Sequence, residues 1–342
     1  MFCNRLVVTL FSLALLFSLN SSADEPVGTL SIEMLRLRPT LLSDESVGAS
    51  FSLSDSAFGL SWRKNKKLSA YVEVSSELSR NLPVYYSAAQ VDRIGFSMAY
   101  AEYLGVYGRI RFGLIPLNFG YDGVLASHEN IYNNALPYSE RIIGLTDQGI
   151  SFYTENNGYY TELVVHNGEI DTASDGRIWT SGNWGFTNGR HFRTQLSLQT
   201  GYVKSSVASS TNSLAGVLPN QTALWRNGIF FLNWYPRNWN IVAQIGGGEV
   251  KQDSQEGRYN NSMIEVTRSI SKNFTAGFRY DQLDPDRKTD GDILTDLSLA
   301  LTFKSADSTS QVIVLATKSI EESGEIPDDQ LRLVWLLTPY AR

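Results

Sequence analysis

The sequence has few of the residues that active sites use most often. Of its 342 residues, one is cysteine and three are histidine. Cys3 lies in an N-terminal segment that we expect to be removed, which would leave no cysteine for a disulfide, a thiolate metal site or a nucleophile. The histidines, His128, His166 and His191, are too scattered to indicate a metal site, and no nucleophile and base stand at a characteristic spacing. We therefore predict that the protein is not an enzyme and has no cofactor.

Charge and long hydrophobic runs are also scarce. The chain has 29 Lys plus Arg against 35 Asp plus Glu, a formal net charge of −6, and only 19% of its residues are charged. Soluble domains average about 25% charged residues, and nucleic-acid binding requires a basic surface, so we expect no nucleic-acid partner. The longest apolar runs after residue 23, such as 228–232 and 312–316, are far shorter than the roughly 20 residues of a spanning helix. A membrane would therefore have to be crossed by a β-barrel.

The first 23 residues have the pattern of an export signal. Arg5 precedes an apolar run over residues 6–19, and Ser21 and Ala23 occupy the small-residue positions that a signal peptidase needs. We predict a signal peptide over 1–23, cleaved after Ala23, with a retained N-terminal anchor as the alternative. Arg5 is the only charge in that segment, so the mature chain, 24–342, has 28 basic against 35 acidic residues, a formal charge of −7.

Strands are expected along the whole mature chain from Thr29 onward. Apolar and polar residues alternate with period 2 in many segments, as over 47–54, 274–281 and 293–303, and no convincing helical stripe exceeds two turns. Each expected strand has one apolar and one polar face. The pattern predicts an all-β protein.

The connectors between these strands alternate in length. Short turns are expected at 63–66, 104–105, 156–157, 187–189, 236–238, 271–272 and 305–308. Longer polar connectors lie between them at 39–45, 79–90, 117–139, 168–175, 205–222, 250–257, 283–291 and 320–328. The division gives about 16 strands with both termini at the short-turn end, the arrangement of a transmembrane antiparallel β-barrel. A soluble sandwich or propeller has no reason to gather its short turns at one end.

Aromatic residues gather near the short turns. Amphipathic rings collect where hydrocarbon meets water, so this set predicts a girdle at the periplasmic interface. The alternative is that these rings form the core of a soluble β protein. The set comprises Trp62, Tyr103, Tyr107, Tyr159, Tyr160, Trp184, Phe186, Trp234, Tyr235, Trp239, Phe274, Phe303 and Trp335.

The third long connector, 117–139, is the candidate for narrowing the lumen. A barrel of about 16 strands is wide enough for an aqueous channel, so a selective channel needs a constriction. We predict that this loop folds inward, with an outer cap as the alternative. In the strand before it, Arg109 and Arg111 are expected on the same face as Tyr107. This face should point into the lumen, because arginine is costly on a lipid-facing surface. The predicted pore-lining or constriction residues are Arg109, Arg111, Tyr107, Asp122, His128, Glu129, Arg141 and Arg279.

The stretch from 105 to 168 resembles the phosphate-selective porin O/P type of Gram-negative porins. It reads GVYGRIRFGLIPLNFG, then SERIIG, then GISFYTENNGYYTELVVHNG: a Gly/Arg strand leads into the third loop, Glu140-Arg141 follows it, and a hairpin ends in Asn167-Gly168. The resemblance implies a 16-stranded, usually trimeric channel narrowed by an inward third loop. Some members carry arginines along the pore, and that role transfers to Arg109 and Arg111.

We therefore expect a porin in the outer membrane of a Gram-negative bacterium. It would form a water-filled channel for passive diffusion of ions and small hydrophilic solutes, with a possible bias toward anions or phosphate. Its expected partners are outer-membrane lipid, lipopolysaccharide and two further copies in a homotrimer. The alternatives are a non-channel surface barrel acting as an adhesin or structural protein, a secreted soluble β-rich binding protein, and a barrel protease or phospholipase with a site assembled across strands.

Overall fold

The computed structural model describes most of the chain after residue 27. The described segments are 28–44, 48–53, 56–75, 95–125, 130–140, 142–168, 178–189, 191–204, 222–252, 255–288, 290–307, 309–322 and 329–341. The predicted signal peptide, including its cleavage after Ala23, lies outside the described residues. Within them, no helix has the length and apolar character needed to span a membrane.

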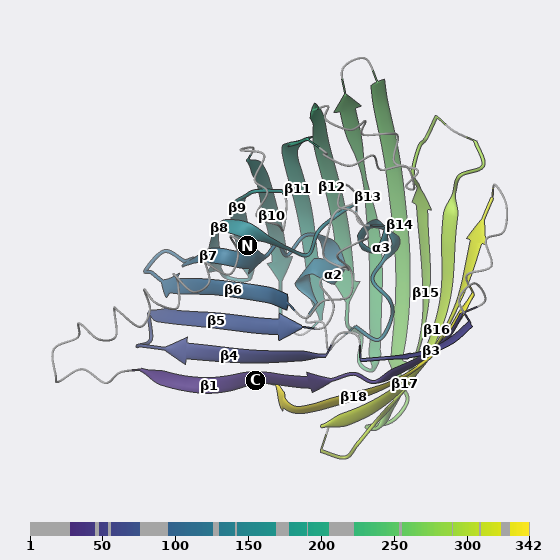
Figure 1. Ribbon diagram of the computed structural model, residues 1–342, viewed down its shortest axis with the longest axis horizontal. Helices are drawn as coiled ribbons and strands as arrows, with labels where there is room; N and C mark the ends of the chain where they lie inside the picture. The colour runs from purple at the N-terminus through teal and green to yellow at the C-terminus, as the bar shows by residue number, and fades with distance from the viewer. Residues whose placement is uncertain are drawn as a thin grey trace.

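The described chain folds into one sheet of 18 strand segments, most of which pair antiparallel with their neighbours in sequence (Figure 1). The segments are β1 (Thr29–Leu37), β2 (Thr40–Asp44), β3 (Gly48–Ser52), β4 (Ala57–Arg63), β5 (Leu68–Ser75), β6 (Gly95–Leu104), β7 (Arg109–Pro116), β8 (Thr146–Asn156), β9 (Tyr159–His166), β10 (Trp179–Thr187), β11 (Phe192–Lys204), β12 (Thr222–Trp234), β13 (Trp239–Gln252), β14 (Gln255–Ser269), β15 (Phe274–Asp284), β16 (Leu294–Lys304), β17 (Ser310–Glu321) and β18 (Gln330–Ala341).

The sheet closes on itself through the last strand. β18 pairs with β2 over Gln330–Val334 and then with β1 over Leu337–Ala341. β2 also pairs with β3, and β1 with β4, so β1 and β2 are halves of one wall strand and β3 and β4 are halves of the next. The 18 segments therefore form a closed antiparallel barrel of 16 wall strands. This confirms the predicted fold class and strand number.

The break in the first wall strand lies at Pro39. Proline has no amide hydrogen to donate to a ladder, and it therefore interrupts strands. The Pro39 carbonyl still accepts a hydrogen bond from the Trp335 amide at 3.0 Å, which keeps the two halves against β18. The sequence-based assignment of 39–45 as a long connector is wrong, because Thr40–Asp44 is strand.

Alternation along the strands separates an apolar outer face from a polar inner face. In β12 the exposure pattern alternates at nearly every residue from Thr222 to Trp234. Exposed apolar side chains recur on the outer face, including Phe112, Leu163, Leu198, Phe230, Ile245, Ile264, Leu299 and Leu333. Buried polar side chains recur on the inner face, including Glu73, Ser151, Glu162, Asn183, Gln195, Asn227, Gln244, Asp281 and Thr302. This is the distribution of a barrel whose outer surface meets lipid.

Most of the aromatic set named above lies exposed on the wall near the short turns. Exposed members include Tyr103, Tyr107, Tyr159, Trp184, Trp234, Tyr235, Trp239, Phe303 and Trp335. Neighbouring rings contact one another on this surface, with centroids 4.8 Å apart for Tyr159 and Phe186 and for Phe274 and Phe303. Tyr160 differs, because it is buried and bonds to Gln195 on the inner face.

The turns follow the expected alternation with one further exception. Asn157 and Gly158 join β8 to β9 with φ of 52° and 83°, the left-handed pair of a tight hairpin. By contrast, the predicted long connector at 250–257 is wrong. β13 and β14 continue to Gln252 and from Gln255, which face each other in the ladder. The long strands β12 to β14 form the tall part of the wall in Figure 1.

The connection between β7 and β8 contains two short helices, α2 (Gly120–Val124) and α3 (Leu136–Ser139). α2 contacts β11 and β12, and α3 contacts β15. In Figure 1 both helices lie within the curve of the sheet. Phe119, Tyr121, Leu136 and Tyr138 from this connection form one buried apolar cluster with wall residues that include Ile229, Phe231, Val242 and Met263. The largest apolar core in the described chain is thus the contact between this connection and the wall.

Candidate functional site

The connection between β7 and β8 is bound to the wall through its own backbone. The Gly120 amide donates to Ser197 Oγ at 3.1 Å, and the Tyr121 amide donates to Gln244 Oε1 at 2.9 Å. The Leu136 amide donates to Asp281 Oδ2 at 2.6 Å. Irregular backbone away from water needs such partners, because an unpaired amide is costly to bury. The inner-face polar residues of β11, β13 and β15 supply them.

Arg279 is the charged centre of this attachment. Its guanidinium donates to Glu265 Oε2 at 2.6 and 3.0 Å and to the Asn133 carbonyl at 2.7 Å. Asp122 Oδ1 lies 3.4 Å from Nη2, and the Tyr132 ring centroid lies 4.7 Å from Cζ. Arg279 is only 3% exposed. One arginine of the wall therefore holds both halves of the connection, through Asp122 on one side and Asn133 on the other.

Two further hydrogen bonds fix the connection internally. Asp122 Oδ2 accepts from the Ala135 amide at 2.6 Å, which joins α2 to the start of α3. The Tyr138 hydroxyl donates to the Phe119 carbonyl. Burial raises the pKa of the Tyr138 phenol well above its ordinary value, so the hydroxyl keeps the proton that this bond requires. The described parts of the connection, which include α2 and α3, are therefore joined to each other as well as to the wall.

Arg109 and Arg111, predicted to face the lumen, are on the inner face of β7. Ile110 and Phe112 beside them are exposed on the outer face. Both arginines lie beside the same carboxylate oxygen. Glu102 Oε2 is 2.8 Å from Arg111 Nε and 3.5 Å from Arg109 Nε. The Arg111 guanidinium stacks over Tyr100 at 4.9 Å, and that of Arg109 over Tyr153 at 4.7 Å. Their side chains remain 13% and 29% exposed, so both stay in contact with solvent.

The other predicted site residues lie in separate places. Asp122 and Arg279 are brought together, but both are buried between the connection and the wall. Tyr107 lies in the β6–β7 turn, 85% exposed, at the end of the barrel opposite the β7–β8 connection. His128, Glu129 and Arg141 lie outside the described residues.

Glu102 offers a test of whether ions pass the arginine pair. We expect Glu102→Gln to leave Arg109 and Arg111 without their shared counter-charge and so to make this part of the inner face more positive. In a bilayer under a KCl gradient, the reversal potential should move toward that of chloride. Glu256→Gln on the outer face, which also removes a carboxylate beside an arginine, is the control. An unchanged reversal potential for Glu102→Gln would mean that these three side chains lie away from the ion path.

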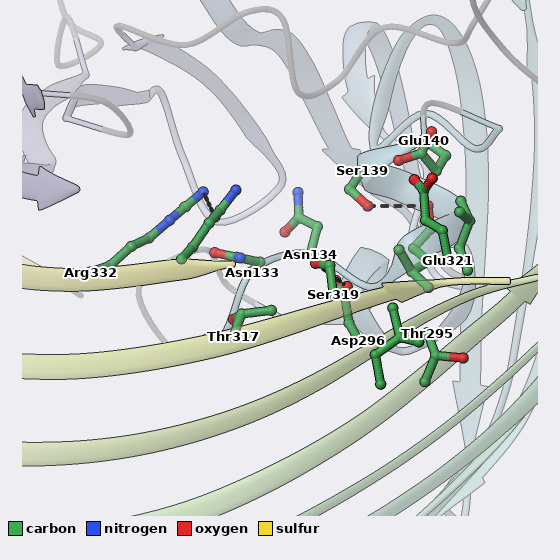
Figure 2. A pocket seen from close by; sticks show the side chains of 14 residues that line it. Asn133, Asn134, Ser139, Glu140, Thr295, Asp296, Thr317, Ser319, Glu321 and Arg332 are labelled. Atoms are coloured by element: carbon green, nitrogen blue, oxygen red, sulfur yellow. Dashed lines mark hydrogen bonds between the residues drawn. The ribbon is translucent and has the colours of Figure 1, made fainter. Parts of the chain in front are cut away.

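A cavity of about 250 Å³ lies between the connection and the wall formed by β16 to β18 (Figure 2). Asn133, Asn134, Ser139 and Glu140 line it from the connection. The wall contributes Leu294, Thr295, Asp296, Thr317, Ser319, Ile320, Glu321, Gln330 and Arg332. Asp296 Oδ1 accepts a hydrogen bond from Ser319 Oγ at 2.7 Å, and Arg332 donates to Gln330 Oε1 at 2.8 Å. Asp296, Arg332 and Glu140 are far apart in the sequence, and nothing in its pattern indicates that they line one cavity.

The structure also assembles a buried Ser–His–Asp chain that the sequence did not reveal. His166 Nδ1 lies 2.6 Å from Asp147 Oδ2, and His166 Nε2 lies 2.8 Å from Ser181 Oγ. The three residues come from β8, β9 and β10, and only strand register brings them together. A catalytic serine must be reached by its substrate, but Ser181 is 5% exposed. These two hydrogen bonds therefore link the neighbouring strands β8, β9 and β10.

Metal binding finds little support in the described segments. No group of three His, Cys, Asp or Glu side chains there is arranged to hold a metal ion together. The described part of the inner face presents charged and hydrogen-bonding side chains.

Comparison with known proteins identifies the fold. No protein-family model and no curated protein matches the sequence. Among solved structures, OmpT of Vibrio cholerae in its trimer form aligns with a TM-score of 0.68 and 12% identity, over 91% of this chain and 99% of that one. The outer membrane channel DcaP of Acinetobacter baumannii aligns with a TM-score of 0.66 and 11% identity, over 93% and 99%. An anion-selective porin from Comamonas acidovorans aligns with a TM-score of 0.62 and 12% identity, over 91% and 99%.

These alignments span 91 to 93% of this chain and 99% of each known chain. At 11 to 12% identity they establish a shared fold, that of bacterial outer-membrane porins and channels. None of the three is described as phosphate-selective, so the more specific resemblance to the phosphate-selective type is not confirmed.

Proposed function

We propose that the protein is an outer-membrane porin that lets ions and small hydrophilic solutes diffuse passively through its lumen. The observation that carries this proposal is the polar cavity between the β7–β8 connection and β16 to β18, inside a closed barrel with an apolar outer face. A water-filled passage requires polar walls, and a lipid-facing surface requires the apolar exterior. No turnover chemistry is needed for such a function.

The β7–β8 connection is the proposed inward third loop that limits the size of passing solutes. Its support comes from the hydrogen bonds to Ser197, Gln244 and Asp281 and from the ion pair between Asp122 and Arg279. These contacts draw the connection toward β11 to β15. The passage then runs on the other side of the connection, along β16 to β18.

The expected anion or phosphate bias has weaker support. It depends on Arg109 and Arg111, and Glu102 offsets one of their two charges. Arg279 is buried in its own ion pairs. Among the described residues that line the cavity, three are acidic and one is basic.

The proposal includes the place and assembly of the protein. An exported chain, with a signal peptide cleaved after Ala23, would reach the outer membrane of a Gram-negative bacterium and contact lipid and lipopolysaccharide there. A homotrimer is proposed by analogy with the trimer form described for the OmpT structure. The alternative is a non-channel surface barrel, either an adhesin or a structural protein.

Planar-bilayer recording of the purified full chain tests this function. We expect stepwise current increments from protein whose folded state is confirmed by a heat-dependent shift in gel mobility. The same preparation after boiling is the control and should give no steps. If the folded protein produces no current increments, the porin proposal is wrong and the surface barrel becomes the better assignment.

A further inference from the structure

A groove of about 580 Å³ lies on the outer face of the barrel, over β15 to β18. Its volume is within the range of about 300–1,000 Å³ that ligand pockets have. Four exposed apolar residues that line it form one row across the sheet, because Phe278 pairs with Leu299, Leu299 with Ala316 and Ala316 with Leu331. The methyl group of Ala316 is the smallest side chain of this row. The surface is therefore hollowed over β17, between Leu299 and Leu331.

A lysine lies at one end of this groove. Lys318 follows Ala316 by two positions on β17, so it shares the outer face, and its side chain is 60% exposed. Its Nζ atom is 3.6 Å from Asp329 Oδ2, and Asp329 Oδ1 accepts a hydrogen bond from the Ser319 amide at 3.1 Å. An exposed ion pair of this length is weak, and a lysine ammonium group has three hydrogen-bond donors. Lys318 can therefore bind a further anionic acceptor.

The height of Lys318 on the wall matches the region below the lipid headgroups. Val312 of β17 pairs with Trp335, one of the aromatic residues near the short turns. From Val312 to Lys318 the strand runs about 20 Å, which is about 15 Å of height for a strand tilted by about 40°. The apolar band of such barrels is about 25 Å tall. The lysine backbone thus lies inside the band, and its long side chain can extend to the headgroups on the side of the long connectors.

We propose that this groove binds one acyl chain of a phosphate-bearing lipid and that Lys318 contacts the phosphate of its headgroup. The acyl chain lies along β17 over Ala316, between Leu299 and Leu331, and Asp329 opposes the phosphate. A second barrel wall presents mainly apolar side chains, whereas a lipid headgroup supplies an anion for the lysine. The inference rests on the outer-membrane location in the proposed function and assigns a lipid partner to one place on the barrel.

Native mass spectrometry of the purified full-length protein in detergent tests the phosphate contact. We expect the wild type to bind dioleoyl phosphatidic acid more tightly than dioleoylglycerol, which has the same acyl chains but no phosphate. Lys318→Gln should weaken binding of the phosphatidic acid by about fivefold, the factor for one adjacent charge pair in water, and leave binding of dioleoylglycerol unchanged. Asp329→Asn should strengthen binding of the phosphatidic acid.

The groove itself is tested by filling it. Ala316→Phe should weaken binding of both lipids, because the new ring takes the place of the acyl chain. Two matched controls on the outer face of β13 should bind both lipids as the wild type does. Ala243→Phe adds the same ring at another exposed alanine, and Lys251→Gln removes a lysine that lies 3.2 Å from Glu249. Heat-modifiable gel mobility shows that each variant is folded, and Ala316→Leu replaces Ala316→Phe if the latter does not fold.

The outcomes separate this proposal from the porin function. Wild-type binding of phosphatidic acid by Lys318→Gln overturns the phosphate contact, and wild-type binding of both lipids by Ala316→Phe overturns the groove. If Ala316→Phe changes the number of subunits but not lipid binding, the groove is an interface between copies instead. Because lipid binding is measured without current, a protein that binds lipid here and does not conduct overturns only the porin function.

Discussion

Replacement of Arg279 with methionine should detach the β7–β8 connection from the wall and enlarge the passage that we propose. The substitution keeps similar side-chain volume but leaves Glu265 and Asp122 as buried carboxylates without their cation. Removal of one partner of a buried ion pair destabilises by about 3–5 kcal/mol. It also removes the hydrogen bond to the Asn133 carbonyl. Single-channel conductance should rise above the wild-type value, and the spread of conductance levels should widen.

Arg258→Met is the matched control for this variant. The Nε atom of Arg258 also lies 2.6 Å from a glutamate oxygen, Glu256 Oε1, but the Arg258 side chain is 53% exposed on the outer face of β14. Exposed pairs contribute about 0–1 kcal/mol, so this variant should keep the wild-type conductance. If Arg279→Met folds and conducts like the wild type, the ion-pair centre does not hold the connection in place.

Replacement of Gly113 with alanine should prevent the barrel from assembling correctly. Gly113 has a φ of 131°, which alanine rarely adopts. A Cβ at this position would lie 2.3 Å from the Ala99 carbonyl oxygen and 2.9 Å from Tyr100 Cα, both backbone atoms of β6. Backbone strain of this kind costs about 1–3 kcal/mol, and the overlap adds about 1–3 kcal/mol. The folded, heat-modifiable band on a gel should be lost or shifted to a lower melting temperature.

Gly228→Ala serves as the comparison for Gly113→Ala. At Gly228 the nearest atom to a new Cβ is Leu198 Cδ2 at 3.2 Å, the end of a side chain that can rotate. This variant should retain the folded band at the wild-type temperature. Equal stability of the two variants would show that β6 and β7 can move apart enough to accept a methyl group, and would contradict the strain argument.

The fold was largely predictable because period-2 alternation and turn spacing are local properties of the sequence. They are enough to predict 16 antiparallel strands with short turns at one end, and the structure confirms both. The errors occur where pairing overrides local polarity. Residues 250–257 are polar, but β13 and β14 extend through them because Gln252 and Gln255 continue an existing ladder. Thr40–Asp44 is strand for the same reason, because it pairs with Gln330–Val334 of β18.

The site was less predictable because it depends on register between distant strands. Alternation of polar and apolar residues assigns a side chain such as Arg279 to one face of its strand but does not say which residue it contacts there. Arg279 pairs with Asp122, a residue from another part of the chain, so a side chain expected to line water is buried. Asp147, His166 and Ser181 come together in the same way. The alternation of polar and apolar residues tells which face of a strand a side chain lies on. Its contacts with other strands exist only after the sheet has formed.

Closure of the barrel through β18 also bears on how the chain folds. The first wall strand finds its second neighbour only in the last strand, at pairs such as Met34 with Ala341 and Thr40 with Val334. Until then the nascent sheet has two free edges, which are templates for pairing with other chains. Joining such distant segments is entropically costly and slow. We therefore expect the seam between β18 and the first wall strand to form late in assembly, and until it forms the two edges of the sheet are open to pairing with other chains.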